Sequence, residues 1–177
     1  MILNSDLMLA HPLWQRADDE LINHHKIFSR LVDIFLIACA IGIKDDKCIP
    51  NSEIEYPLDP PKSIGRNTYL SMNNSDLHDI LYFLLQNAII TSKQIDYTSE
   101  DRLKLAFNPD FEDKKFSPPQ FLVGFANYGI EQMYSVINND LPSVAIANSL
   151  HQYLSSQIET GYEDILAGLT LEELIQE

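Results

Sequence analysis

The chain has 177 residues, of which 45% are hydrophobic and 10% aromatic, a composition that suits a folded domain and argues against global disorder. Its 12 Lys and Arg residues stand against 26 Asp and Glu residues, which gives a formal charge of −14. This balance disfavours a protein that binds DNA or RNA on its own, or that docks on an anionic membrane, because both need basic side chains. It suits a basic protein partner, or simply keeps the chain soluble.

The acidic charge is unevenly distributed along the chain. Lys115 is the last basic residue, and residues 116–177 hold eight acids without any Lys or Arg. A solvated acidic surface is the more ordinary interpretation of such a bias. An electropositive partner for the C-terminal third is the sharper alternative.

The two cysteines and the apolar segments indicate in which cellular compartment the protein is expected. Cys39 and Cys48 have neither disulfide nor metal-ligand spacing, which predicts reduced thiols. The N-terminus lacks the features of a signal peptide, and the apolar run from Ile34 to Ile43 is too short to span a bilayer. We therefore expect a soluble, cytoplasmic protein without a membrane partner.

The N-terminal part of the chain predicts one central helix. Apolar residues recur at helical spacing over residues 27–43, and from Ile34 to Ile43 the run is apolar on every side, as in a helix in a core or at an interface. Gly42 is predicted to form a left-handed C-cap. A helix beginning near Ala17 either continues through Gly42 or breaks near residues 23–25, and the sequence leaves both open.

Residues 43–72 form the least regular stretch. Four prolines within residues 50–61 exclude a helix and favour a loop over the surface. Residues 64–72 suit either a short strand or a turn into the next helix. We expect at most a small β-hairpin within residues 43–72.

Helical patterns dominate the remainder of the chain. Further helices are predicted over residues 76–92, 99–107 with Ser99 as N-cap, 120–138 after Pro118-Pro119, 143–158 after Pro142, and from Thr170 onward. Gly124 and Gly129 indicate a close helix crossing in the third of these. The predicted fold is mainly α: one globular domain over residues 1–177, whose acidic C-terminal helical segment covers residues 159–177.

Two groups of residues loosely resemble catalytic sites. His24 and His25 follow the acids Asp18, Asp19 and Glu20, but metal sites need three or four convergent ligands, and no further ligands are evident. Asp110, Glu112 and Lys114 resemble a nuclease constellation, yet all three fall in one short loop.

Other catalytic and nucleotide-binding motifs are missing from the sequence. There is no phosphate-binding glycine loop and no nucleophile elbow, and Lys62 to Arg66 is the only local basic spot beside a glycine. The sequence therefore predicts no catalytic residue, no metal ligand and no cofactor.

Two apolar segments carry a family resemblance. The pattern Phe28…Asp33-Ile-Phe35…Ala38-Cys-Ala-Ile-Gly-Ile43…Cys48-Ile-Pro50 and the segment 121–130 resemble small accessory proteins of bacterial DNA-defence islands. These are the accessory proteins of Dnd phosphorothioation systems and the middle components of ABC-three-component systems, which include the Lamassu-type small subunit. The resemblance implies a non-enzymatic subunit that bridges an SMC-like ATPase and an effector nuclease of the same operon.

We accordingly expect an adaptor or regulatory subunit of an anti-phage or anti-plasmid complex, which does not contact nucleic acid by itself. The partner-contact surface is expected at the end of the central helix, in the proline-rich excursion and in the acidic C-terminal helices. Its residues are Ile37, Ile41, Ile43, Ile64, Arg66, Tyr162, Glu163, Leu171 and Leu174. The alternatives are an acidic DNA-mimic inhibitor of a nuclease and, with less support, a small metal-dependent enzyme that uses His24 and His25.

Overall fold

The computed structural model describes residues 3, 5–70, 75–108, 111, 113–138 and 140–168, with side chains described up to residue 159. Helices make up 64% of the model, with seven α-helices and one small two-stranded sheet in the part described, which confirms the mainly α prediction. The chain divides into two compact units, Met1–Tyr134 and Ser135–Glu177. The prediction of one domain over residues 1–177 placed no boundary there, and each unit is described by itself.

The sheet of the first unit joins segments that are far apart in sequence. Strand β1 (Leu7–Leu9) pairs antiparallel with β2 (Lys62–Ile64), so that Leu7 lies opposite Ile64. Residues 43–72 were predicted to hold at most a small β-hairpin; of the two strands, only β2 lies there, and its partner β1 lies near the N-terminus. The prolines that precede β2 lack the N–H groups that a second strand there would need. Helix α3 (Arg66–Leu70) follows β2 almost at once.

The helix that starts near the N-terminus is interrupted, which settles one open alternative. Helix α1 (Leu13–Arg16) runs into the π-helix η1 (Ala17–His24), where His25 N donates to Glu20 O over 2.7 Å. Lys26 then adopts a positive φ of 53° and the helical path ends. Helix α2 (Leu31–Lys44) is a separate element.

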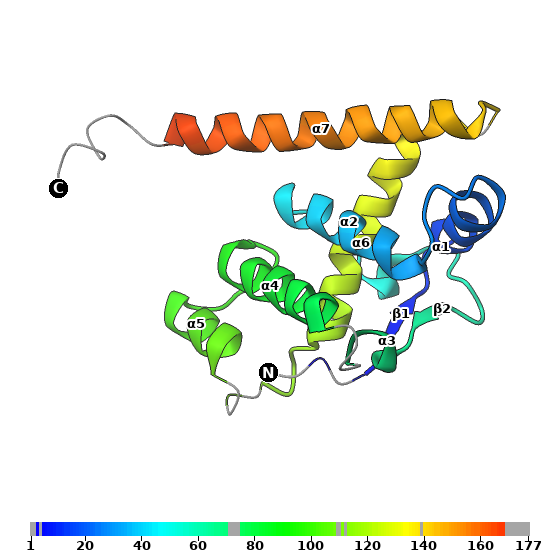
Figure 1. Ribbon diagram of the computed structural model, residues 1–177. Coiled ribbons are helices and arrows are strands. Elements are labelled where there is room, and N and C mark those ends of the chain that lie inside the picture. The colour runs from blue at the N-terminus through cyan, green and yellow to red at the C-terminus, as the bar shows by residue number, and fades with distance from the viewer. Residues whose placement is uncertain are drawn as a thin grey trace. The chain divides into compact units, whose positions relative to one another are not determined.

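A close crossing of α2 and α6 (Pro118–Ser135) builds the centre of the first unit (Figure 1). A Cβ atom at Gly129 would overlap the backbone carbonyl of Ala38, and one at Gly42 would overlap that of Phe125. Glycine is required at both positions because the two backbones touch there. The prediction of a close crossing at Gly129 is confirmed.

The predicted C-cap role of Gly42 is wrong. Gly42 is a buried residue inside α2, and the helix continues to Lys44. The left-handed residue after the helix is Asp46, with φ of 49°. Aspartate tolerates this conformation better than most residues, because its short polar side chain bonds locally.

Helices α4 (Ser75–Thr91) and α5 (Ser99–Phe107) form a helical hairpin in the first unit (Figure 1). Both helices lie close to their predicted positions. The N-cap of α5 is Thr98 rather than Ser99, since Thr98 Oγ1 accepts a hydrogen bond from Asp101 N over 3.2 Å. The hairpin buries an inner apolar side composed of Leu77, Leu81, Leu85, Ala88, Ile89, Leu105 and Ala106.

The second unit contains α7 (Ser143–Gly168). This helix begins directly after Pro142 as predicted, and it continues beyond the predicted end at residue 158. The helix predicted from Thr170 onward lies outside the described residues. Within the described chain, no helix combines the length and apolar character needed to cross a membrane.

Candidate functional site

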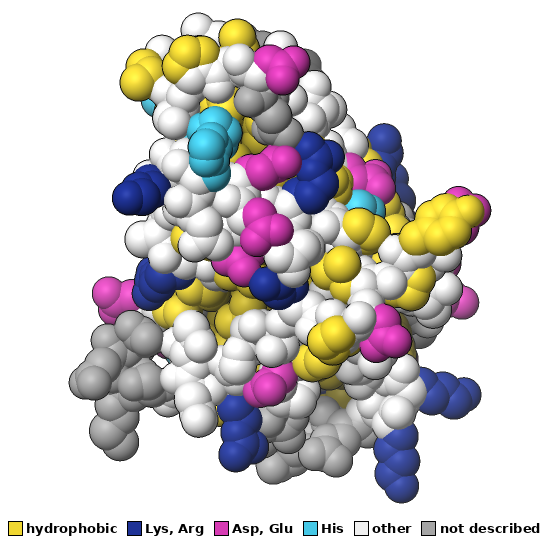
Figure 2. Space-filling view, turned by 90° about the vertical axis from the view of Figure 1, so that its right-hand side faces the viewer, with side chains coloured by type: hydrophobic (Ala, Val, Ile, Leu, Met, Phe, Trp, Pro, Cys, Tyr) yellow, Lys and Arg dark blue, Asp and Glu magenta, His cyan; other side chains and the backbone are white. Residues whose placement is uncertain are grey.

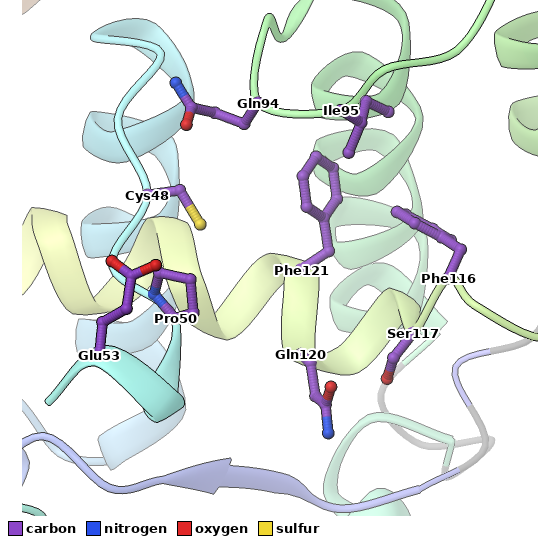
Figure 3. A pocket seen from close by; sticks show the side chains of 9 residues that line it. All are labelled: Cys48, Pro50, Glu53, Gln94, Ile95, Phe116, Ser117, Gln120 and Phe121. Carbon is purple, nitrogen blue, oxygen red and sulfur yellow. The ribbon is translucent and has the colours of Figure 1, made fainter.

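An open pocket of about 400 Å³ lies in the first unit (Figure 3). Four segments contribute to it: the loop that follows α2, the short 3-10 helix η2 (Asn51–Glu53), the loop between α4 and α5, and the start of α6. The residues that line the pocket are Cys48, Pro50, Glu53, Gln94, Ile95, Phe116, Ser117, Gln120 and Phe121. We call this hollow the loop pocket.

The loop after α2 is fixed against α6 by a buried polar network. Ile49 N donates to Gly124 O over 2.9 Å, and Asn127 Nδ2 donates to Ile49 O over 2.9 Å and to Asn51 Oδ1 over 3.0 Å. The fully buried Asn127 accepts in turn from Trp14 Nε1 over 2.8 Å. A buried network whose members are all paired rigidifies the segments that it joins. It holds Cys48, Pro50 and Glu53 in place.

The loop between α4 and α5 is anchored on one side by Asp46. The Asp46 carboxylate accepts from Ser92 Oγ over 2.6 Å and from Lys93 N over 3.0 Å. Gln94 Nε2 donates to the Asp46 carbonyl over 2.7 Å. This places Gln94 at the edge of the pocket.

Arg102 anchors the same loop from its other side. Its guanidinium donates to the carbonyl oxygens of Ile95 over 2.7 Å and Ile89 over 3.3 Å, and also to that of Ser92. A cation near the last carbonyl groups of α4 satisfies acceptors that the helix leaves unpaired. The pocket residue Ile95 is thereby held by its backbone.

A chain of aromatic rings forms the opposite wall. Phe116 packs edge-on against Phe121 with ring centroids 5.1 Å apart, and Phe121 packs against Phe125 at 4.9 Å. Tyr97 extends the chain at 6.3 Å from Phe116. Such edge-to-face contacts are favoured by the charge distribution of the rings. Tyr97 also donates to Asp113 Oδ2 over 2.6 Å, and this hydrogen bond is the main cause that raises the pKa of Tyr97 to about 12.

The thiol in the pocket is poorly suited to nucleophilic chemistry. Burial, followed by the negative charges of Glu53 and Asp46, raises the pKa of Cys48 to about 11. Burial also raises the pKa of Cys39, which is fully enclosed, and both cysteines are free as predicted. Because a thiol must ionise to attack, Cys48 is protonated and unreactive near neutral pH.

The sequence-predicted contact residues divide by exposure. Ile41, Ile43 and Ile64 have side chains only 4–8% exposed. They therefore offer no open surface in this structure: neighbouring elements cover Ile41 and Ile43 on the apolar helix α2, and Ile64 is a buried residue of β2. Their part in partner binding stays a prediction. Ile37 is half-buried and Arg66 is exposed. None of these residues lines the loop pocket.

The remaining predicted contact residues belong to the second unit. Tyr162 and Glu163 lie on α7, although the description of side chains stops before them. Leu171 and Leu174 fall outside the described residues. Their part in partner binding stays a prediction.

The suggested metal cluster does not form in the described part of the chain, where no group of three or more His, Cys, Asp or Glu side chains is placed to hold an ion. The rings of His24 and His25 pack on one another at 4.6 Å. Glu20 accepts a hydrogen bond from Tyr134 over 3.1 Å and forms an ion pair with Arg16 at 3.3 Å. Its carboxylate therefore already has two partners within the protein.

The other two sequence candidates also gain no support. Lys62 forms an ion pair of 2.7 Å with Asp18, so the basic spot before Arg66 is partly neutralised. Asp110 and Glu112 lie outside the described residues, so the nuclease-like group with Lys114 has no described geometry.

An exposed apolar surface on the α4–α5 hairpin was missed by sequence reasoning. Its members are each 39–67% exposed: Ile80, Phe83, Ile90, Leu103 and Phe107, which we call the hairpin face. Helix α4 is apolar on two sides, and its periodicity alone does not show which side is left open. On the different face drawn in Figure 2, acidic and basic side chains are interspersed.

No family model, curated protein or solved structure matches the chain. Its class is therefore defined by its own features: a mainly helical protein with an exposed hairpin face and a rigidly walled pocket.

Proposed function

We propose that the chain is a non-enzymatic adaptor or regulatory subunit of a bacterial anti-phage or anti-plasmid complex, which bridges an SMC-like ATPase and an effector nuclease. The hairpin face is the observation that supports a binding function. Large exposed apolar side chains on neighbouring helices are typical of protein-binding surfaces. Burial of a large apolar side chain against a partner contributes roughly 1.5–3 kcal/mol, so Phe83 and Phe107 alone supply a substantial anchor.

The identity of the partners rests on the resemblance of the α2 and α6 segments to accessory proteins of DNA-defence islands. A bridging subunit needs a second contact surface besides the hairpin face. Arg66, which is exposed, and the acidic residues from Glu159 onward are the candidates for it. These acids suit a basic surface on the second partner.

The DNA-mimic alternative receives less support from the second unit. A protein that imitates duplex DNA needs acidic groups spread along one face, in the manner of phosphates. Residues 141–158 contain no Asp or Glu, and the described side chains of this unit include only Asp140 and Glu159 as acids. The acids of α7 begin only at Glu159, so the first part of this helix carries none.

The proposal is tested by purifying the tagged protein from cells that carry its neighbouring genes, followed by size exclusion and mass spectrometry. We expect an ATPase and a nuclease to co-elute with it in fixed proportion. The double variant Phe83→Ser, Phe107→Ser should lower the yield of at least one partner about tenfold, the equivalent of ~1.4 kcal/mol.

Val144→Ser is the matched control, because Val144 is an equally prominent apolar side chain, 72% exposed, that lies outside the hairpin face and outside the predicted contact segments. It should leave the complex intact. A protein that elutes alone would contradict the adaptor function. If the complex formed with the double variant but not with the control variant, the hairpin face would not be the contact surface.

A further inference from the structure

The only formal charge among the residues that line the loop pocket is negative. Of the nine residues that line it, none is basic, and Glu53 is the only one with a formal charge at neutral pH. Within the described chain, no Lys, Arg or His lies at ion-pair distance from the exposed Glu53 carboxylate. Burial is the main cause of the raised pKa of the Cys48 thiol, and the negative charges of Glu53 and Asp46 raise it further.

The wall opposite this carboxylate is aromatic. Figure 3 shows Glu53 and Cys48 on one side of the hollow and Phe121 and Phe116 on the other. Both rings are half-buried, so each keeps part of its surface open. The face of an aromatic ring carries partial negative charge and attracts a cation within about 6 Å. Carboxylate and rings therefore favour the same kind of ligand.

We propose that the loop pocket binds a guanidinium group. A guanidinium is planar and stacks on an aromatic ring, and its fork of N–H donors matches a carboxylate. In this pocket it stacks on Phe121 and pairs with Glu53, while the exposed amide of Gln94 offers an acceptor oxygen at the rim. An ammonium ion satisfies the carboxylate but lacks the flat surface for stacking, and an anion is repelled.

Two sources supply this chemistry: the arginine side chain of a protein, and a small free guanidino compound. A volume of about 400 Å³ accommodates either. The inference rests on the loop pocket alone and is independent of the hairpin face and of the adaptor function.

The test is a calorimetric titration of the full chain with three probes. The first is agmatine, the second a terminally blocked peptide with one central arginine, and the third the same peptide with citrulline in place of arginine. Citrulline retains the shape of the side chain but not its charge. We expect the arginine peptide to bind at least tenfold more tightly than its citrulline twin.

Variants of the protein connect this binding to the pocket. Glu53→Gln should weaken binding of the arginine peptide about tenfold, and Phe121→Leu should weaken it several-fold. Glu55→Gln removes the same charge from an exposed neighbour that does not line the pocket, and it should leave binding unchanged. Urea denaturation confirms that each variant is folded before titration.

Every outcome bears on the proposal. Strong binding of agmatine as well as the peptide identifies a free guanidino compound as sufficient, and binding of the peptide alone identifies an arginine side chain. Equal binding of the arginine and citrulline peptides overturns the proposal. So do equal effects of Glu53→Gln and Glu55→Gln, and so does the absence of binding by both cationic probes.

Discussion

The α2–α6 crossing and the α4–α5 hairpin use apolar sequence in opposite ways. At the crossing the contact residues are small, among them Ala38, Gly42 and Gly129, and the two backbones approach until they touch. On the hairpin face large side chains such as Phe83 and Phe107 remain in solvent. Apolar character alone thus does not place a residue in the core. An apolar side chain is buried only where another helix or strand lies close enough to cover it.

This comparison predicts very different sensitivities to mutation. The crossing has no spare volume, so any added atom must displace a backbone. The hairpin face makes few contacts within the chain, so changes there should leave folding almost unaffected and act on binding.

Gly129→Ala should destabilise the protein by about 3 kcal/mol or more, because the new Cβ overlaps the carbonyl of Ala38. In most helices a change from glycine to alanine raises the free energy of unfolding by about 1 kcal/mol, so the expected effect here is of opposite sign. The free energy of unfolding from urea titration measures the effect. Gly65→Ala is the control, since nothing lies within 4 Å of a Cβ there. Equal stability of the two variants would contradict the touching backbones.

The hairpin offers a matched pair of leucines on one helix. Leu105 is 2% exposed and Leu103 is 53% exposed. Leu105→Ala should cost roughly 2–3 kcal/mol, because it removes buried methyl groups and leaves a cavity. Leu103→Ala should change the free energy of unfolding by less than about 0.5 kcal/mol. Comparable losses in urea titrations of both variants would show that the hairpin face is covered within the chain.

The elements near these two regions were largely predictable, because they depend on local pattern. The periodicity of α4 and the two prolines at the start of α6 predict both helices, and Gly129 predicts the close crossing. The C-cap prediction for Gly42 failed because glycine is used both as a helix C-cap and as a contact residue inside a helix. Only the position of α6 distinguishes these uses.

Features that depend on distant segments could not be predicted. The partner of β2 lies more than fifty residues earlier in the chain, at β1. The loop pocket combines residues from 48–53, 94–95 and 116–121, and no local motif connects these segments. The hairpin face was hidden for another reason: Phe83 and Ile90 look like core residues until the inner side of α4 is seen to be filled by others.

The hydrogen bond between Tyr97 and Asp113 provides the smallest expected effect, and a dependence on pH. Tyr97 is the main cause of the lowered pKa of the Asp113 carboxyl group. A carboxyl whose pKa is lowered by folding stabilises the protein above its ordinary value of 3.8, and this contribution is lost as pH falls through the lowered pKa. The contribution of Tyr97 to stability depends on pH in the opposite direction. Its contribution is present below its ordinary pKa of 10.0 and disappears as pH rises towards about 12.

Tyr97→Phe should therefore lower the urea midpoint slightly near neutral pH, because the half-buried carboxylate of Asp113 loses a donor but remains in contact with water. The difference from the unchanged protein should vanish at both ends of the pH range, first in acid below the ordinary pKa of the carboxyl group. Tyr56→Phe removes a hydroxyl from an exposed ring outside this contact, and its midpoint should follow the unchanged protein throughout. If the Tyr97→Phe difference stayed constant into strong acid, the charge of Asp113 would not be its source, since the variant keeps the ring contact with Phe116 and loses only the hydroxyl group.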